Sequence, residues 1–186
     1  MTKSLKIYCI ICLWVLCIPQ FYLQATEVSV VPYLGYSQHS YSEGFATEHS
    51  TATVLGAMGG LNISNYLFVG LDYHTGGIYE HSEQIEKSFR NVMFGGGIAW
   101  RFSNGRVWGG YYDHCQLEDS NQFYVMKGTA VKVSLSIRVK KRIFISFDHI
   151  SQNIKENSYL GTDVALPDKH SSSISGISIS APIDFN

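Results

Sequence analysis

Apolar and polar residues alternate along the chain in pieces of about ten residues, the length of a tilted strand that crosses a membrane. In the clearest piece, from Thr129 to Val139, every second position from Val131 onward is valine, leucine or isoleucine, and the positions between them are mostly polar. Successive side chains of a β-strand point to opposite faces. The pattern therefore predicts strands with one apolar face.

Eight pieces of the chain have a strand-like pattern. They are 28–37, 55–63, 67–74, 92–102, 107–115, 129–139, 143–148 and 176–185. In the last piece, Ile177, Ile179, Ala181, Ile183 and Phe185 share one face. The piece 107–115 is strand-like in composition, but its alternation has no clear phase.

The connections between these pieces are alternately short and long. The short ones are Ser64–Tyr66, Ser103–Arg106 and Lys140–Arg142, and the long polar ones are 38–51, 77–88, 116–122 and 152–170. In the second short connection, Asn104-Gly105 favours a type I′ hairpin turn because both residues tolerate positive φ. Short turns alternating with long loops are typical of an up-and-down barrel with both chain ends on the side of the short turns, whereas a β-sandwich gives no reason for this order. We therefore predict an all-β fold, an eight-stranded antiparallel up-and-down transmembrane β-barrel.

Residues 1–25 have the pattern of a secretory signal peptide. Lys3 and Lys6 precede the apolar run Ile7–Ile18, which is shorter than the ~20 residues of a transmembrane helix, and Ala25 offers a small residue for cleavage. We expect cleavage there, which leaves residues 26–186 as the outer-membrane barrel domain. Loss of the two lysines changes the formal net charge from −1 to −3.

Composition excludes several other classes of protein. A net charge of −1 shows no basic excess, so we predict no nucleic-acid partner. Of the four cysteines only Cys115 lies outside the signal peptide, so the mature chain forms no intrachain disulfide and we expect an inert thiol. The histidines lack the spacing of metal ligands, and the chain has no dinucleotide or P-loop motif. We predict no metal, no cofactor and a monomer.

The inward positions of the predicted strands carry charges of both signs. They are Asp72, His74, Arg101, Lys132, Arg138 and Asp148. An eight-stranded barrel is just wide enough for side chains, so its charges must be paired. The short turn at Lys140 brings Asp148 near Ser134 and diagonal to Lys132 in register. These positions predict a packed polar lumen; a conducting pore is the alternative from another class.

Taken together, these patterns resemble the small outer-membrane barrels of the outer-membrane protein X, Ail and OmpA transmembrane type. Those families end on an aromatic residue that the barrel-assembly machinery reads, and Phe185 with Ile183 and Ile179 looks like that signal, although Asn186 follows it. The resemblance implies location in the bacterial outer membrane, contact with its lipids and lipopolysaccharide, and extracellular loops for envelope or host-surface interaction, of the adhesion or resistance type.

A second, local resemblance is to the lipid A 3-O-deacylase family. The segment Asp148–Asn153 resembles its His-x-Ser-Asn motif, and the family has a lipid-facing serine hydrolase site near the outer rim. The resemblance implies that His149 is the general base and Ser151 the nucleophile of a lipid A acyl-ester hydrolase. Gln152 stands where the family has asparagine, and Ser173 where it has glutamate, so Glu156, Asp163 or Asp168 would have to replace that acid. Two polar residues where a strand leaves the membrane are the other interpretation, and the non-enzymatic function is our first prediction.

Overall fold

The computed structural model describes residues 27–43, 46–81, 86–119, 124–159 and 162–185. These residues form nine strands. They are β1 Glu27–Glu43, β2 Ala46–Asn62, β3 Leu67–His81, β4 Glu86–Phe102, β5 Gly105–Asp119, β6 Tyr124–Lys140, β7 Ile143–Tyr159, β8 Thr162–Ser180 and β9 Ile183–Phe185. The predicted signal peptide, residues 1–25, lies outside the described residues.

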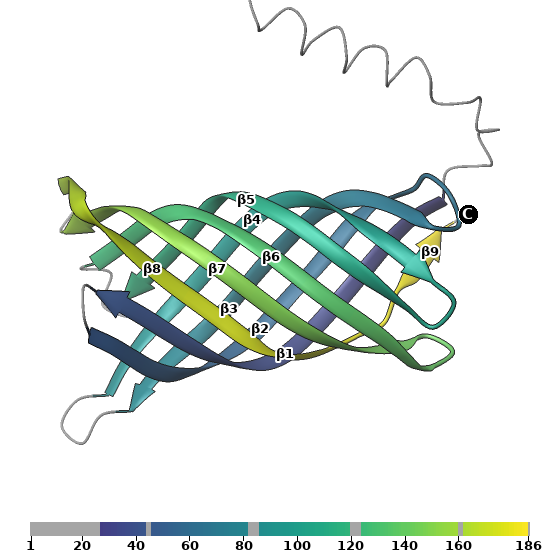
Figure 1. Cartoon of the computed structure of the whole chain (residues 1–186), viewed down its shortest axis with the longest axis horizontal. Coiled ribbons are helices and arrows are strands. Elements are labelled where there is room, and N and C mark those ends of the chain that lie inside the picture. The colour runs from purple at the N-terminus through teal and green to yellow at the C-terminus, as the bar shows by residue number, and fades with distance from the viewer. Residues whose placement is uncertain (1–26, 44–45, 82–85, 120–123, 160–161, 186) are drawn as a thin grey trace, which may run out of the picture.

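The strands form one closed antiparallel sheet (Figure 1). Each strand from β1 to β7 pairs with the next one along the chain, and β8 pairs back with β1, which closes the barrel. The short β9 continues the course of β8 along β1. The predicted eight-stranded barrel is therefore confirmed. Within the described part of the chain, no helix is long or apolar enough to cross a bilayer.

Outward side chains form an apolar band around the barrel. The band comprises Val28, Leu34, Tyr36, Leu55, Leu61, Val69, Leu71, Tyr73, Phe94, Ile98, Trp100, Phe102, Val107, Tyr111, Val131, Val133, Leu135, Ile137, Phe147, Ile177 and Ile179. Val133, for example, is 50% exposed. A continuous apolar surface of this extent is far larger than the patches that soluble monomers expose, and it is the surface that a membrane barrel turns to lipid. The predicted outward faces are confirmed.

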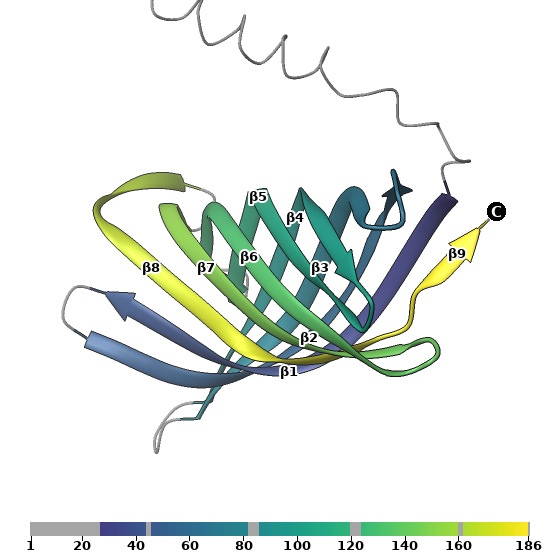
Figure 2. The same cartoon turned by 45° about the vertical axis from the view of Figure 1, so that its right-hand side comes forward.

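The two ends of the barrel differ. We call the end formed by residues 63–66, 103–104 and 141–142 the turn end; β9 and the start of β1 also lie there (Figure 2). The outer end is where β1, β3, β5 and β7 finish. The apolar band lies toward the turn end, and the strands continue past it to the outer end.

This continuation corrects the four predicted long loops. Strands β1 to β8 have 15 to 19 residues, and most of 38–51, 77–88, 116–122 and 152–170 is strand. The connections that remain lie outside the described residues. Beyond the band the outward positions become polar, as at Thr53 and Asn153, while inward positions such as Ala52 and Ile154 stay buried. The apolar outward positions therefore stop at the edge of the band, whereas the pairing between strands continues beyond it.

The hairpin between β4 and β5 turns one residue earlier than predicted. Phe102 pairs with Gly105, so Ser103 and Asn104 form the loop instead of Asn104-Gly105. Gly105 is needed for space, since a Cβ there would overlap the carbonyl oxygen of Ser136 on β6. The tight turn after β2 is confirmed: Ser64 Oγ accepts hydrogen bonds from the N–H groups of Tyr66 and Leu67, at 3.2 and 3.1 Å. The turn after β6 is one residue shorter than predicted, because Lys140 pairs with Ile143 and only Lys141 and Arg142 remain in the turn.

Of the several irregularities in the described strands, two bear on the predicted pieces. The predicted last strand breaks between β8 and β9 at Ala181-Pro182, because proline has no N–H to donate to β1. In β5, the register shifts between Tyr112 and Cys115, and Tyr112 and Cys115 are both buried three positions apart. A bulge of this kind adds a residue to one strand and reverses its inward and outward positions. It explains why the alternation of 107–115 has no single phase.

Candidate functional site

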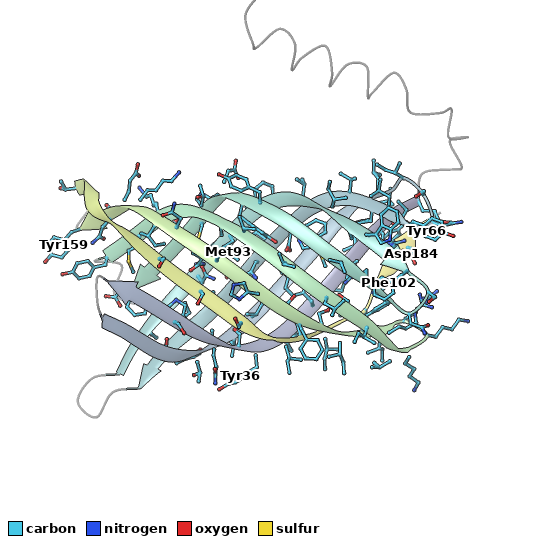
Figure 3. The ribbon with its side chains drawn as sticks, in the orientation of Figure 1. Tyr36, Tyr66, Met93, Phe102, Tyr159 and Asp184 are labelled. Carbon is cyan, nitrogen blue, oxygen red and sulfur yellow. The ribbon has the colours of Figure 1, made fainter. Side chains whose placement is uncertain are left out.

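Side chains fill the lumen of the barrel, as predicted. Three clusters of buried apolar residues follow one another along it: one around Phe68 and Trp108, one around Met93 and Tyr112, and one around Ile78. Figure 3 shows Met93 inside the barrel, between the labelled residues at its two ends. Large buried rings occupy the space that a water-filled channel would need.

A polar network centred on Asp72 lies among these clusters. Its carboxylate is fully buried and accepts hydrogen bonds from the Tyr33 hydroxyl at 2.8 Å, from the Tyr112 hydroxyl and from Lys132 Nζ at 3.0 Å. Lys132 Nζ also donates to the Tyr33 oxygen at 3.1 Å and lies 4.2 Å from the centre of that ring. The four residues come from β3, β1, β5 and β6, so the network ties together opposite walls of the barrel.

The pairing of the other lumen charges differs from the prediction. Asp148 is opposite Ser134 as expected, but it accepts a hydrogen bond from Ser178 at 2.5 Å, whereas Lys132 pairs with Asp72. Arg101 and Arg138 lie at the turn end and form no ion pair with another described residue; each guanidinium instead contacts a phenylalanine ring. His74 is buried, and neither of its ring nitrogens has a partner among the described residues. The prediction that the charged side chains of the lumen pair with one another is therefore confirmed only for Asp72 and Lys132 among the described residues.

The sequence prediction missed three residues of the lumen. Tyr33 is at an inward position of 28–37, but the pattern gives it no role. Arg106 falls in the predicted connection Ser103–Arg106, although β5 begins at Gly105, and Tyr112 falls in the piece 107–115, whose phase is not predicted. Arg106 is 5% exposed and donates hydrogen bonds to Ser136 Oγ at 3.3 Å and Ser180 Oγ at 3.2 Å. Inward and outward positions alternate in one phase from Arg106 to Tyr112, and the register shift between Tyr112 and Cys115 then breaks it, so the piece 107–115 as a whole does not mark Tyr112 as inward.

Toward the outer end, beyond the apolar band, two buried groups have altered acidity. His39 lies between Ser50 Oγ at 3.1 Å and Ser172 Oγ at 2.5 Å, and burial lowers the pKa of the imidazole to about 4. Burial raises the pKa of the Cys115 thiol to about 12, so the thiol stays protonated at neutral pH. No group of histidine, cysteine or acidic side chains among the described residues is arranged to hold a metal ion.

The candidate catalytic residues lie on the outside of β7 at the edge of the apolar band, where Val133 and Val131 of β6 are their cross-strand neighbours. His149 and Ser151 are both exposed and share the outward face with Phe147. Ser175 on β8 is directly opposite His149, and its Oγ lies 2.8 Å from His149 Nδ1. Ser151 is opposite Ser173. The serine in contact with the imidazole is therefore Ser175, which the sequence analysis did not name.

A histidine that acts as a general base is usually oriented by a neighbouring acid, and the predicted acids do not lie beside His149. Asp148 points inward, and Glu156 lies seven residues farther along β7. The side chains of Asp163 and Asp168, the two other predicted substitutes, lie outside the described residues. No described carboxylate contacts His149.

Exposed tyrosines mark the outer end. Tyr124 begins β6 and Tyr159 ends β7; they are opposite each other in register, and their ring centres are 4.8 Å apart. They are 46% and 49% exposed. Figure 3 shows Tyr159 at the far end of the barrel from Asp184, Phe102 and Tyr66. This pair lies well beyond the apolar band, where lipid does not explain exposed aromatic rings.

Solved structures with this fold are small membrane barrels. A structure of Ail, the attachment invasion locus protein of Yersinia pestis, matches with a TM-score of 0.55 and 12% identity, over 85% of this chain and 99% of Ail. Ail in complex with the heparin analogue sucrose octasulfate matches with a TM-score of 0.58 and 14% identity, over the same shares. Neisserial surface protein A has a TM-score of 0.57 and 12% identity, over 82% of this chain and 96% of its own.

The chain has the fold of the small outer-membrane β-barrels. The predicted structural resemblance to the Ail type is confirmed. At these identities the likeness concerns the fold alone. No protein-family model and no curated protein matches the sequence. Together with the apolar band, the fold indicates an integral protein of the bacterial outer membrane.

Proposed function

We propose that this outer-membrane barrel uses its outer end to contact surfaces outside the cell, as an adhesion-type or envelope-interaction protein without catalytic activity. The observation that carries the proposal is the length of the strands. They continue past the apolar band with polar outward faces, and so form a rigid platform beyond the membrane. A barrel that served only as a membrane-embedded structure would need strands of about ten residues.

The tyrosine pair at this platform has the character of a binding anchor. Tyr124 and Tyr159 are exposed, pack against each other and are held at the ends of paired strands. Tyrosine is enriched at the residues that carry most of the binding energy in protein interfaces, since a rigid ring gives a large contact area for little loss of entropy. A protein on a neighbouring surface is the partner that this feature favours.

Charge argues against a polyanion as the ligand of this end. Ail, which has this fold, has been solved with a heparin analogue. Among the residues beyond the band whose side chains the structure describes, however, three are cations and four are acids. They are Arg90, Lys127 and Lys155, and Asp113, Glu118, Asp119 and Glu156. Such a balance provides no positive field to attract a sulfated chain.

Cell binding by tyrosine variants tests the proposal. Bacteria that display the protein should adhere to host cells, and Tyr124→Ser/Tyr159→Ser should reduce adhesion at least fivefold without changing the amount of folded barrel. Tyr66→Ser is the matched control, because Tyr66 is also exposed, at 60%, and stacks on another aromatic ring, Trp100, at the turn end. Equal adhesion by the double variant and the wild type, or an equal loss in the control, would overturn the assignment of the outer end.

The remaining partners follow from membrane residence. We propose that the band contacts outer-membrane lipids and lipopolysaccharide, that Phe185 on β9 is read by the barrel-assembly machinery, and that the barrel is a monomer. Phe185 is exposed at the end of the strand that pairs with the start of β1. Phe185→Ser should lower the yield of folded protein in cells but not refolding from urea into detergent. A loss of both would identify Phe185 as a stability residue instead.

The alternative proposal is a lipid A deacylase, and the contact of His149 Nδ1 with Ser175 Oγ favours it. Activation of a serine by a neighbouring histidine is the usual arrangement for acyl transfer, and this pair lies where the apolar band ends. The sequence resemblance names Ser151 as the nucleophile, and the contact names Ser175. Mass spectrometry of lipid A from cells with wild type, Ser151→Ala and Ser175→Ala separates the two. Identical lipid A from these cells and from cells without the protein would exclude the enzyme.

A further inference from the structure

The turn end of the barrel opens into a cavity of about 280 Å³. Five cationic side chains line it, from three strands and one turn: Arg101, Arg106, Arg138, Lys141 and Arg142. Asp184 on β9 is the acidic residue in the lining, and its carboxylate already accepts a hydrogen bond from Ser29 Oγ at 2.8 Å. The cavity is thus a concentration of positive charge at the mouth of the lumen.

None of these five cations forms an ion pair with a described residue, although such pairing is what a narrow lumen would favour. Of the acids deeper in the lumen, Asp72 is paired with Lys132, and Asp148 accepts a hydrogen bond from the neutral Ser178, so that its charge offsets part of the charge of Arg106. Like charges that are held together repel each other, and this arrangement costs stability unless an anion from outside completes it.

Two of the arginines, Arg106 and Arg138, are held in place before any ligand arrives. Arg106 is almost fully buried and bonded to Ser136 and Ser180, and its guanidinium carbon lies 5.4 Å from the centre of the Phe144 ring. Arg138 contacts the same ring at the same distance. Aromatic contact fixes the planar guanidinium groups but leaves their N–H donors available toward the cavity.

We propose that this cavity is a binding site for a multivalent oxyanion of the phosphate class. Guanidinium groups present paired N–H donors that match two oxygens of a phosphate, and several of them around one cavity favour an ion with more than one negative charge over a single carboxylate. The site opens at the turn end, which in barrels of this kind faces the periplasm. It therefore differs in place and in chemistry from the outer end, to which we assign surface contact.

Calorimetry on the folded full-length barrel, in a zwitterionic detergent free of phosphate, tests the site. Pyrophosphate and inorganic phosphate should bind saturably at one site, pyrophosphate more tightly, and acetate should not compete. Arg138→Gln/Arg142→Gln removes two exposed cations of the lining and should weaken binding by about tenfold or more for each lost charge-assisted contact. Lys141→Gln provides a second variant if that one does not fold, as judged by its heat-dependent mobility on gels.

Lys140→Gln is the matched control, because Lys140 precedes the same turn and is exposed but does not line the cavity. It should weaken binding less than twofold. Absence of saturable binding, equal competition by acetate, or an equal loss in Lys140→Gln would overturn the site. Nanodiscs then distinguish two sources of the phosphate. Weaker apparent pyrophosphate affinity in phosphatidylglycerol than in phosphatidylcholine supports a lipid headgroup as the occupant, and equal affinity supports a free anion.

Discussion

Replacing Asp72 by asparagine should destabilise the barrel by about 3 kcal/mol. The substitution keeps the shape of the side chain but leaves Lys132, which is 2% exposed, without its ion-pair partner. Removing one member of a buried pair costs about 3–5 kcal/mol, since the other charge stays in a poorly solvated site. We expect a cost near the lower limit of this range, because Lys132 Nζ still donates a hydrogen bond to the Tyr33 hydroxyl at 3.1 Å and still contacts the face of the Tyr33 ring.

Urea titration in lipid vesicles measures this cost through the fluorescence of Trp100 and Trp108. Asp113→Asn is the control, because Asp113 is exposed on β5 and the chemical change is identical. In Asp72→Asn/Lys132→Met, the loss should fall short of the sum of the two single losses by about 1–3 kcal/mol, as expected for coupled residues. If Asp72→Asn lowered the free energy of unfolding by an amount within about 0.5 kcal/mol of the effect of Asp113→Asn, the ion pair of Asp72 and Lys132 would not be a main source of the stability of the lumen.

Three further predictions concern other parts of the barrel. Val133→Arg should cost up to about 2–4 kcal/mol of folding free energy in bilayers, because Val133 faces lipid between Val131 and Leu135 of the band, and an unchanged free energy would contradict that placement. The lowered pKa of His39, about 4 against 6.5 when unfolded, favours its neutral form, so its contribution to stability is complete above pH 6.5 and is lost as the pH falls toward 4. The largest contribution that this pKa shift can make to the free energy of unfolding is on the order of 3 kcal/mol. His39→Asn should therefore flatten the pH dependence of this free energy between about pH 4 and 6.5. Planar-bilayer recordings should show no large, stable channel, since Trp108 and Tyr112 fill the lumen.

The strands within the lipid could be predicted because one face of each meets a uniform solvent. Hydrocarbon accepts only apolar side chains, so the outward positions of 131–139 are all apolar and fix the phase of that strand. The tight turns were also predictable, from their polar residues and their position between two such pieces. The position of the turn at Ser103-Asn104 could not be predicted, because it depends on the close approach of Gly105 to β6.

The interior could be predicted in kind but not in detail. The alternation placed Asp72 and Lys132 inward, but whether they meet depends on the stagger of strands that are distant in the sequence. Register changes such as the bulge in β5 add a further uncertainty, and this one concealed Tyr112. The candidate His149 site shows the same limit: its cross-strand neighbour Ser175 is 26 residues away along the chain.

One strand shows where function is to be sought in a barrel of this kind. The outward face of β7 passes from Phe147 in the apolar band, through His149 and Ser151 at its edge, to Tyr159 at the outer end. The period of two holds from Phe147 to Asn153, and the register shifts between Ile154 and Glu156. The environment changes twice along this path, so the sequence signal that reveals the strand disappears where the strand leaves the lipid. Within the apolar band the outward residues must be apolar to contact lipid, so few of them are available to bind another ligand. Residues where the signal fails are free of that constraint, and the tyrosine pair and the cationic cavity both lie in such places, at opposite ends of the barrel.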